Sequence, residues 1–213
     1  MICYCFSGLG ADGRVFKNIR IDGVELKALD WIEPKRNENL SDYAVRLLSD
    51  QNTEVPFMLM GVSFGGMLAI EAAKKYTPVK LILISTLLGE SEFPFTLKLG
   101  RRLKAHKWVP MSLMLNPKGY IRYVFGVTKP RHAKVLHHIV DDIDPQFFAW
   151  AMGAIVMWKN RRVKTKYIRI HGAKDRLIPV SKNFEGQMID GAGHFMIRTH
   201  WRNINKILNE KID

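Results

Sequence analysis

PFMLMGVSFGGMLAIEAAKKY, residues 56–76, predicts a strand, a sharp turn and a helix in direct succession. Residues 57–60 form an apolar run of strand length, and after Gly66 the apolar side chains recur at helical spacing. Ser63 lies on the turn between them, flanked by Gly61 and Gly65 in the pattern G-x-S-x-G. We therefore expect the serine where the strand ends and the helix begins.

This turn has the geometry that a nucleophilic serine requires. A sharp bend strains the backbone of the serine, and side chains two residues away on either side would collide, so both places need glycine. The bend lifts the hydroxyl above the sheet. The first free N–H groups of the helix, including that of Phe64, point to where negative charge would develop. The alternative is a glycine-rich turn whose serine has no catalytic role.

Strand patterns recur along the chain and alternate with helical ones. The other expected strands are residues 1–6, 24–29, 80–85, 166–170 and 184–189, and the expected helices include 15–19, 41–50 with Ser41 as its cap, and 201–212. Long right-handed crossovers between strands make the sheet parallel and cover both of its faces. The predicted fold class is α/β, a doubly wound, mainly parallel six-stranded sheet with strand order 2-1-3-4-5-6. Ligands bind such sheets where the winding reverses, here between the first and third strands.

Between residues 87 and 160 the alternation of strand and helix stops. The stretch is helical in pattern and is divided into short helices by Pro94, Pro110, Pro117, Pro130 and Pro145. We predict one domain over residues 1–213, with 87–160 as a helical insertion in it, which we call the cap.

Positive charge is concentrated in this insertion. The net charge of the chain is +13, and residues 93–140 contain ten Lys or Arg and no Asp or Glu. One interpretation is that these side chains are solvated helix faces. The others are attraction of an anionic acyl substrate or carrier, and peripheral contact with an acidic membrane surface. Nucleic acid is not an expected partner, because no base-stacking or groove-entering module is recognisable.

A serine hydroxyl becomes a good nucleophile only when a base takes its proton and a carboxylate holds that base. Among the histidines, His194 lies in a loop directly after the last predicted strand, in GAGHF. Among the acids, Asp175 follows the fifth predicted strand, in HGAKDRLIP. The candidates occur in the order Ser63, Asp175, His194. The alternatives are a turn aspartate that bonds its own backbone and a histidine with only a structural role.

With GVSFGG at 61–66, GAKDRLIP at 172–179 and GAGHF at 191–195, the chain resembles the α/β-hydrolase fold family over nearly its whole length. The resemblance implies Ser63 as nucleophile, Asp175 as acid and His194 as general base. It also implies an oxyanion hole formed by the backbone N–H groups of Phe64 and Leu9, with Gly10 as second choice for the latter. Two features depart from the pattern. Many members carry His-Gly where this chain has Ser7 followed by glycine, and many begin with a further strand hairpin that is absent here.

Composition limits the other classes of function. An apolar fraction of 47% and a charged fraction of 25% are typical of a soluble globular protein. No apolar run reaches the length of a membrane helix and the N-terminus has no leader pattern, so we expect a cytoplasmic protein. Cys3 and Cys5 are expected as core residues. Neither a metal-ligand spacing nor a dinucleotide or phosphate loop is visible, so we expect no metal and no cofactor.

The sequence thus predicts a serine hydrolase that cleaves carboxylic esters or thioesters of a small acyl substrate through an acyl-enzyme. Hydrolysis of another bond, such as an amide or a carbon–carbon bond, by the same three residues is one alternative. A non-catalytic binding protein on the same scaffold is the other.

Overall fold

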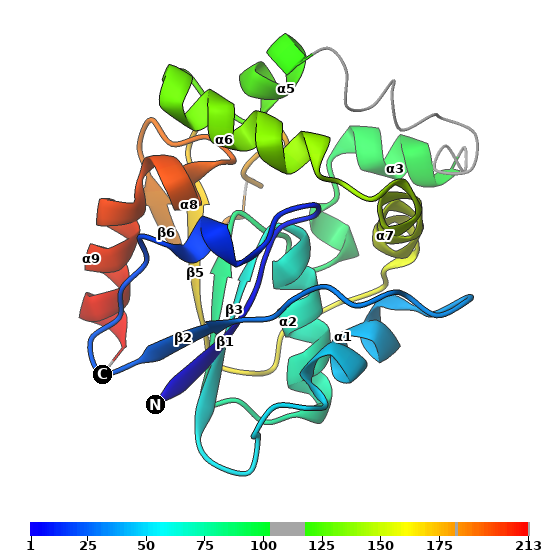
Figure 1. Ribbon diagram of the computed structural model, residues 1–213, viewed down its shortest axis with the longest axis vertical. Coiled ribbons are helices and arrows are strands. Elements are labelled where there is room, and N and C mark those ends of the chain that lie inside the picture. Colours follow the sequence, from blue (N-terminus) through cyan, green and yellow to red (C-terminus); the bar gives the residue numbers. More distant parts are fainter. Residues whose placement is uncertain (103–117, 182, 213) are drawn as a thin grey trace.

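The fold is a six-stranded parallel sheet, seen in a computed structural model that describes residues 1–102, 118–181 and 183–212 (Figure 1). The strands are β1 (Ile2–Phe6), β2 (Glu25–Ala28), β3 (Phe57–Val62), β4 (Lys80–Ile84), β5 (Tyr167–Gly172) and β6 (Gln187–Ile189). Every neighbouring pair is parallel, and the order is β2-β1-β3-β4-β5-β6. The predicted fold class and strand order are confirmed.

The central strands are buried on both faces. All six residues of β3 are buried, as are the last four of β4, which explains why both strands appear in the sequence as unbroken apolar runs. Cys3 and Cys5 are buried free thiols in the core, as predicted.

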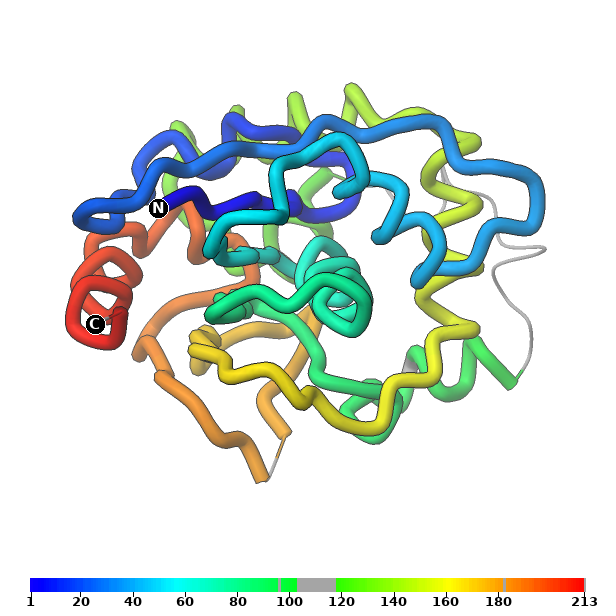
Figure 2. The backbone as a smooth tube through the Cα atoms, turned by 90° about the horizontal axis from the view of Figure 1, so that it is seen from below, coloured from blue at the N-terminus to red at the C-terminus, as the bar shows by residue number. Residues whose placement is uncertain are grey.

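Helices cover each face of the sheet. Helices α1 (Leu40–Leu48) and α2 (Phe64–Lys75) pack on one face, and the 3-10 helix η1 (Gly13–Phe16), α8 (Met196–Thr199) and α9 (Trp201–Lys211) pack on the other. Figure 2 shows the sheet from below, with α9 (red) and α2 (blue-green) on opposite sides of it. The termini lie close together at the end of the molecule away from the strand ends that carry Ser63 (Figures 1 and 2).

The chain between β4 and β5 is helical in its described part and lies above the carboxyl ends of the strands (Figure 1). It contains η2 (Glu90–Glu92), α3 (Phe95–Arg102), α5 (Lys118–Val124), α6 (Pro130–Asp141) and α7 (Pro145–Met157). Pro130 and Pro145 occupy the first turns of α6 and α7, where a proline has no hydrogen bond to lose. Pro110 and Pro117 lie outside the described residues. The limits 87–160 for the cap stay a prediction.

Several predicted boundaries were wrong. The cap of α1 is Asn39, whose side chain accepts a hydrogen bond from Asp42 N–H at 3.0 Å, and not Ser41. The helix predicted over 15–19 is a single 3-10 turn, η1, at 13–16. Strand β6 starts only at Gln187, because the aromatic ring of Phe184 packs against Arg169 and His171 instead of joining the sheet.

Candidate active site

Ser63 occupies a strained turn between β3 and α2. Its φ of 53° and ψ of −120° lie in a region that non-glycine residues rarely adopt. The turn closes tightly because Gly61 and Gly65 lack side chains. A Cβ at Gly61 would lie 2.3 Å from Gly65 O, and one at Gly65 would lie 2.2 Å from Phe6 O. The glycines therefore allow the bend that exposes the serine hydroxyl to the pocket.

The structure brings Ser63, His194 and Asp175 together at the carboxyl ends of β3, β5 and β6. The distance from His194 Nε2 to Ser63 Oγ is 2.9 Å, and from His194 Nδ1 to Asp175 Oδ2 it is 2.8 Å. Residues 131 positions apart in sequence are thus in hydrogen-bond contact. A carboxylate only accepts hydrogen bonds, so the hydrogen on the imidazole lies on Nδ1 and Nε2 is left to accept from the serine hydroxyl. This is the arrangement of a general base beside a nucleophile.

The carboxylate of Asp175 is buried and has donors at both oxygens. Its Oδ1 accepts from the backbone N–H groups of Leu177, at 3.0 Å, and Ile178, at 2.8 Å. Burial alone would raise the pKa of this carboxyl. The charge of His194 and the hydrogen bonds from His171, His194 and Ile178 outweigh burial, and the pKa lies well below its ordinary value. Asp175 is therefore an anion that faces His194 throughout the neutral range.

The two proposed oxyanion donors both line the same pocket as Ser63. Phe64 is the first residue of α2, so its N–H has no acceptor within the helix. Leu9 lies in the loop after β1, and no described residue accepts a backbone hydrogen bond from it. Ser7, at the place where many related sequences carry histidine, donates its hydroxyl to Ala11 O at 2.7 Å and fixes this loop. The oxyanion role of both N–H groups stays a prediction.

A cavity of about 460 Å³ opens above Ser63 and His194. Its walls are apolar and come mainly from the helices between β4 and β5. They include Leu97 on α3, Phe125 directly after α5, Leu136 and Ile139 on α6, and Phe148 and Ile155 on α7. Among the described lining residues none is Asp, Glu, Lys or Arg. Ser63 therefore lies at the base of an apolar chamber.

Sequence reasoning missed two neighbours of the catalytic candidates. His171 is buried beneath the acid loop, and its Nε2 lies 3.2 Å from Asp175 Oδ2. Phe125 presents its ring to that of His194 edge to face, with ring centres 5.2 Å apart. For His171, its place four residues before the acid in HGAKD was a usable signal. Nothing in the sequence pointed to Phe125, because its contact depends on how the cap folds over the sheet.

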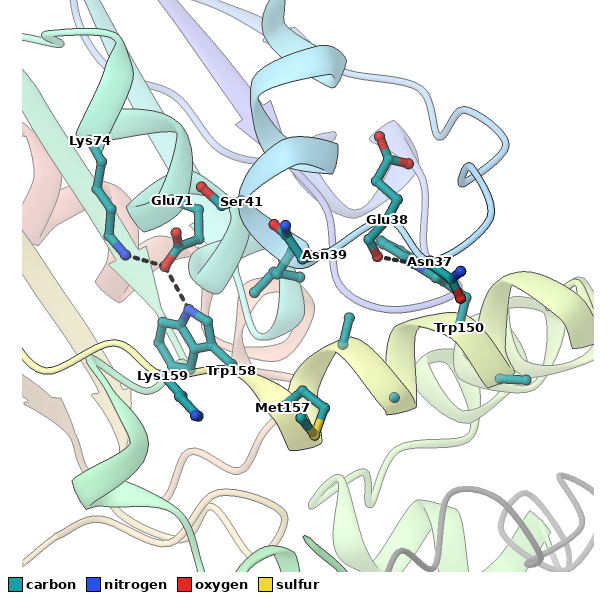
Figure 3. Close-up of a pocket in the computed structure, with 14 residues that line it drawn as sticks. Asn37, Glu38, Asn39, Ser41, Glu71, Lys74, Trp150, Met157, Trp158 and Lys159 are labelled. Carbon is teal, nitrogen blue, oxygen red and sulfur yellow. Dashed lines mark hydrogen bonds and ion pairs between the residues drawn. The ribbon is translucent and has the colours of Figure 1, made fainter.

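A second hollow lies away from these residues, between α1, α2 and α7 (Figure 3). It measures about 550 Å³ and contains none of Ser63, Asp175 or His194. Buried Glu71 lies in this hollow. Its carboxylate accepts a hydrogen bond from Trp158 Nε1 at 2.7 Å and forms an ion pair with Lys74 (Figure 3). Trp150 Nε1 donates to Glu38 O at 2.8 Å. These contacts hold α7 against α2 and against the residues before α1. We propose no chemical role for the hollow.

Within residues 1–102, 118–181 and 183–212, no three His, Cys, Asp or Glu side chains gather in a way that could hold a metal ion. In the same part of the chain, no helix combines the length and the apolar character needed to cross a bilayer. A cytoplasmic location stays a prediction.

No protein-family model matches the chain, and neither does any curated protein. Solved structures do match it in fold. An esterase from Thermogutta terrifontis is 16% identical over 99% of this chain and 88% of its own, with a TM-score of 0.72. A putative non-heme bromoperoxidase from Mycobacterium tuberculosis H37Rv is 13% identical over 98% and 90%, with a TM-score of 0.73. A polyneuridine aldehyde esterase variant is 15% identical over 100% and 99%, with a TM-score of 0.66. At such identities the likeness establishes a shared fold.

Proposed function

We propose that this chain, which has the α/β-hydrolase fold, is a serine hydrolase that cleaves carboxylic esters or thioesters. The observation that carries the proposal is the continuous line of contacts from Ser63 Oγ through His194 to Asp175, at 2.9 and 2.8 Å. That line ends at an apolar cavity large enough for a small organic substrate.

In the first half-reaction, Ser63 Oγ attacks the substrate carbonyl carbon as its proton passes to His194 Nε2. The carbonyl oxygen becomes an oxyanion, which the N–H groups of Phe64 and Leu9 stabilise. The C–O or C–S bond then breaks, and the leaving alcohol or thiol takes the proton from His194. The acyl group stays on Ser63 as an ester.

In the second half-reaction, His194 takes a proton from water, and the resulting hydroxide attacks the acyl-enzyme. The second tetrahedral intermediate collapses as His194 returns the proton to Ser63 Oγ, and the carboxylic acid leaves. Asp175 stabilises the charged imidazole in both halves and holds its Nε2 toward the serine.

The lining of the cavity supports an apolar acyl group. A charged group beside the reacting carbonyl would be desolvated without a partner among the described lining residues, which is costly. Each methylene buried there should instead favour binding by about 0.8 kcal/mol, or roughly fourfold. The described Lys and Arg side chains of the cap lie outside this lining, so an anionic part of a substrate would find no described cation within it.

The test is labelling with a fluorophosphonate probe and hydrolysis of p-nitrophenyl esters of increasing acyl length. The parent should react with the probe, prefer longer acyl chains until the cavity is full, and lose both activities in Ser63→Ala. Ser91→Ala, which changes a serine exposed outside the cavity, is the matched control and should behave as the parent. Equal labelling of Ser63→Ala and parent would refute the proposal. Absence of labelling and of hydrolysis in the folded parent would favour a non-catalytic binding protein.

A further inference from the structure

Helices α3, α5 and α6 form the upper layer of the molecule in Figure 1. Each turns one face to the cavity or the core and the other to solvent. On α6, for example, Ala133, Leu136 and Ile139 are buried, whereas Arg131 and Lys134 are exposed. We call the outward faces of these three helices the roof.

The roof exposes large apolar side chains that the fold does not cover. Phe95 is 77% exposed and Leu99 is 43% exposed on α3, and Tyr120 and Tyr123 are each 61% exposed on α5. A single exposed apolar residue needs no explanation, but four of this size on two helices that line one cavity do, even though Tyr120 also lines the cavity and the guanidinium of Arg176 lies over the Tyr123 ring. Tyr and Phe are also the residues that settle at the boundary between lipid headgroups and hydrocarbon.

The same surface is cationic. Eight of the ten Lys and Arg of residues 93–140 lie in the part that the structure describes, and that segment contains no acid. Of these eight, only Arg101 and Lys118 have a described carboxylate within ion-pair distance, namely Glu90 and Asp141. At the start of α6, the capping residue Lys129 and the helix residues Arg131 and Lys134 form no ion pair with a described residue, and the one acid of the helix, Asp141 at its end, pairs with Lys118. A surface with this excess attracts anions.

We propose that the roof docks on the surface of an anionic lipid bilayer. Charge complementarity with acidic headgroups and the exposed Phe95, Leu99 and tyrosines favour this occupant over a soluble anion, which would use the charges and leave the apolar side chains in water. A protein partner would be expected to cover the apolar residues with a complementary apolar surface, and it would not require an acid-free segment.

The roof and the cavity share the same helices. Leu97 and Gly100 on α3 and Tyr120 on α5 line the cavity, while Phe95 and Leu99 face outward one turn away or less. A lipid-bound roof would thus place the apolar chamber next to the membrane, from which an acyl chain could enter without crossing water. This link to substrate delivery rests on the proposed function, whereas docking itself does not.

The experiment measures sedimentation of the full chain with vesicles, in the Ser63→Ala background so that no lipid is hydrolysed. Vesicles contain phosphatidylcholine alone, or phosphatidylcholine with phosphatidylglycerol at roughly three to one. We expect binding to the anionic vesicles and little to the neutral ones. Arg131→Gln with Lys134→Gln should weaken binding by about 25-fold, since each cation near the surface is worth roughly fivefold. Phe95→Ser with Leu99→Ser should weaken the binding that remains at high salt.

Matched controls change similar side chains at the opposite end of the sheet. Lys164→Gln with Lys166→Gln removes two exposed cations, and Val79→Ser removes an exposed apolar side chain just before β4. These should bind as the parent does. Equal binding to both vesicles, an equal loss in controls and roof variants, or full competition by soluble glycerophosphoglycerol would overturn the proposal.

Activity on a water-soluble short ester separates this proposal from the previous one. Because Arg131, Lys134, Phe95 and Leu99 do not line the cavity, the roof variants made with Ser63 intact should hydrolyse that ester at the parental rate. A chain that binds vesicles but hydrolyses no ester would refute the proposed function and leave the docking surface standing. Hydrolysis without vesicle binding would refute the docking surface and leave the proposed function standing.

Discussion

His171 Nε2 lies 3.2 Å from Asp175 Oδ2, the oxygen that also contacts His194 Nδ1 at 2.8 Å. The N–H of His171 is directed at Ile178 O, at 2.9 Å, and the N–H of Ile178 returns to Asp175 Oδ1 at 2.8 Å. A closed ring of contacts therefore connects the end of β5, the acid loop and the carboxylate. Two imidazoles converge on one carboxylate, and only His194 reaches the serine.

The first prediction concerns this ring. His171→Leu removes the N–H group that donates to Ile178 O and lies beside Asp175. The carboxylate should then no longer be oriented toward His194. We expect kcat on a short ester to fall by about tenfold or more with a smaller change in KM, because His171 itself does not line the cavity. His171→Gln, which can still donate to Ile178 O, should recover most of kcat. If both variants kept the parental kcat, His171 would have only a packing role.

The second prediction concerns the carboxylate itself. Asp175→Asn keeps the shape of the side chain, but its amide group can favour the imidazole tautomer with the hydrogen on Nε2, which cannot accept from Ser63. We expect kcat to fall by about 10⁴ while the fold is retained. Ester hydrolysis with circular dichroism as a folding control measures both. A loss below tenfold would show that Asp175 does not orient the base.

The third prediction concerns stability at low pH. The pKa of Asp175 in the folded chain is well below the ordinary aspartate value of 3.8, so its ionised form stabilises the fold above that value. That stabilisation is lost as the pH falls from the ordinary pKa through the depressed one. Urea unfolding between pH 6 and pH 2 should show a steeper loss of stability for the parent than for Asp175→Asn. Parallel pH profiles would contradict the assignment.

The fourth prediction concerns the turn. Gly65→Ala would place a Cβ 2.2 Å from both Phe6 O and Ser7 O, which cannot move without disturbing β1. We expect a loss of about 2–3 kcal/mol in the free energy of unfolding, together with loss of probe labelling at Ser63. Gly119→Ala in α5 is the matched control, because a Cβ there meets nothing within 4 Å. It should be neutral or stabilise α5 by up to about 1 kcal/mol. Equal effects of the two changes would argue against a strained turn.

Much of the fold could be predicted because its signals are local. Apolar runs mark β3 and β4, and the helical spacing after Gly66 marks α2. The parallel sheet followed from the alternation of strands and helices, and its order from placing β3 beside β1 with β2 outside it. Element ends were harder to predict. Asn39 and Ser41 are both good capping residues, and only the backbone decides which side chain reaches a free N–H, here that of Asp42.

The candidate site also has parts that the sequence predicts and parts that only the structure shows. Ser63, Asp175 and His194 could be chosen by sequence because each has a type and a place at a strand end that chemistry requires. The contacts of His171 and Phe125 depend on distances between elements, which a one-dimensional pattern does not carry. The lining of the cavity was equally hidden, since many apolar residues of the cap could face inward or pack on the core.

The sequence by itself determined the parallel sheet, its order and the three polar side chains at its carboxyl edge. The periodicity of apolar side chains and the residue preferences of turns are local properties that can be read from the sequence. Only the tertiary structure decided that His194 Nε2 lies 2.9 Å from Ser63 Oγ, that no Asp, Glu, Lys or Arg is among the described residues lining the cavity, and that the described cap helices expose cations and aromatic side chains to solvent. The physical reason is that packing sets which face of each helix meets the core, and packing joins residues far apart in the chain.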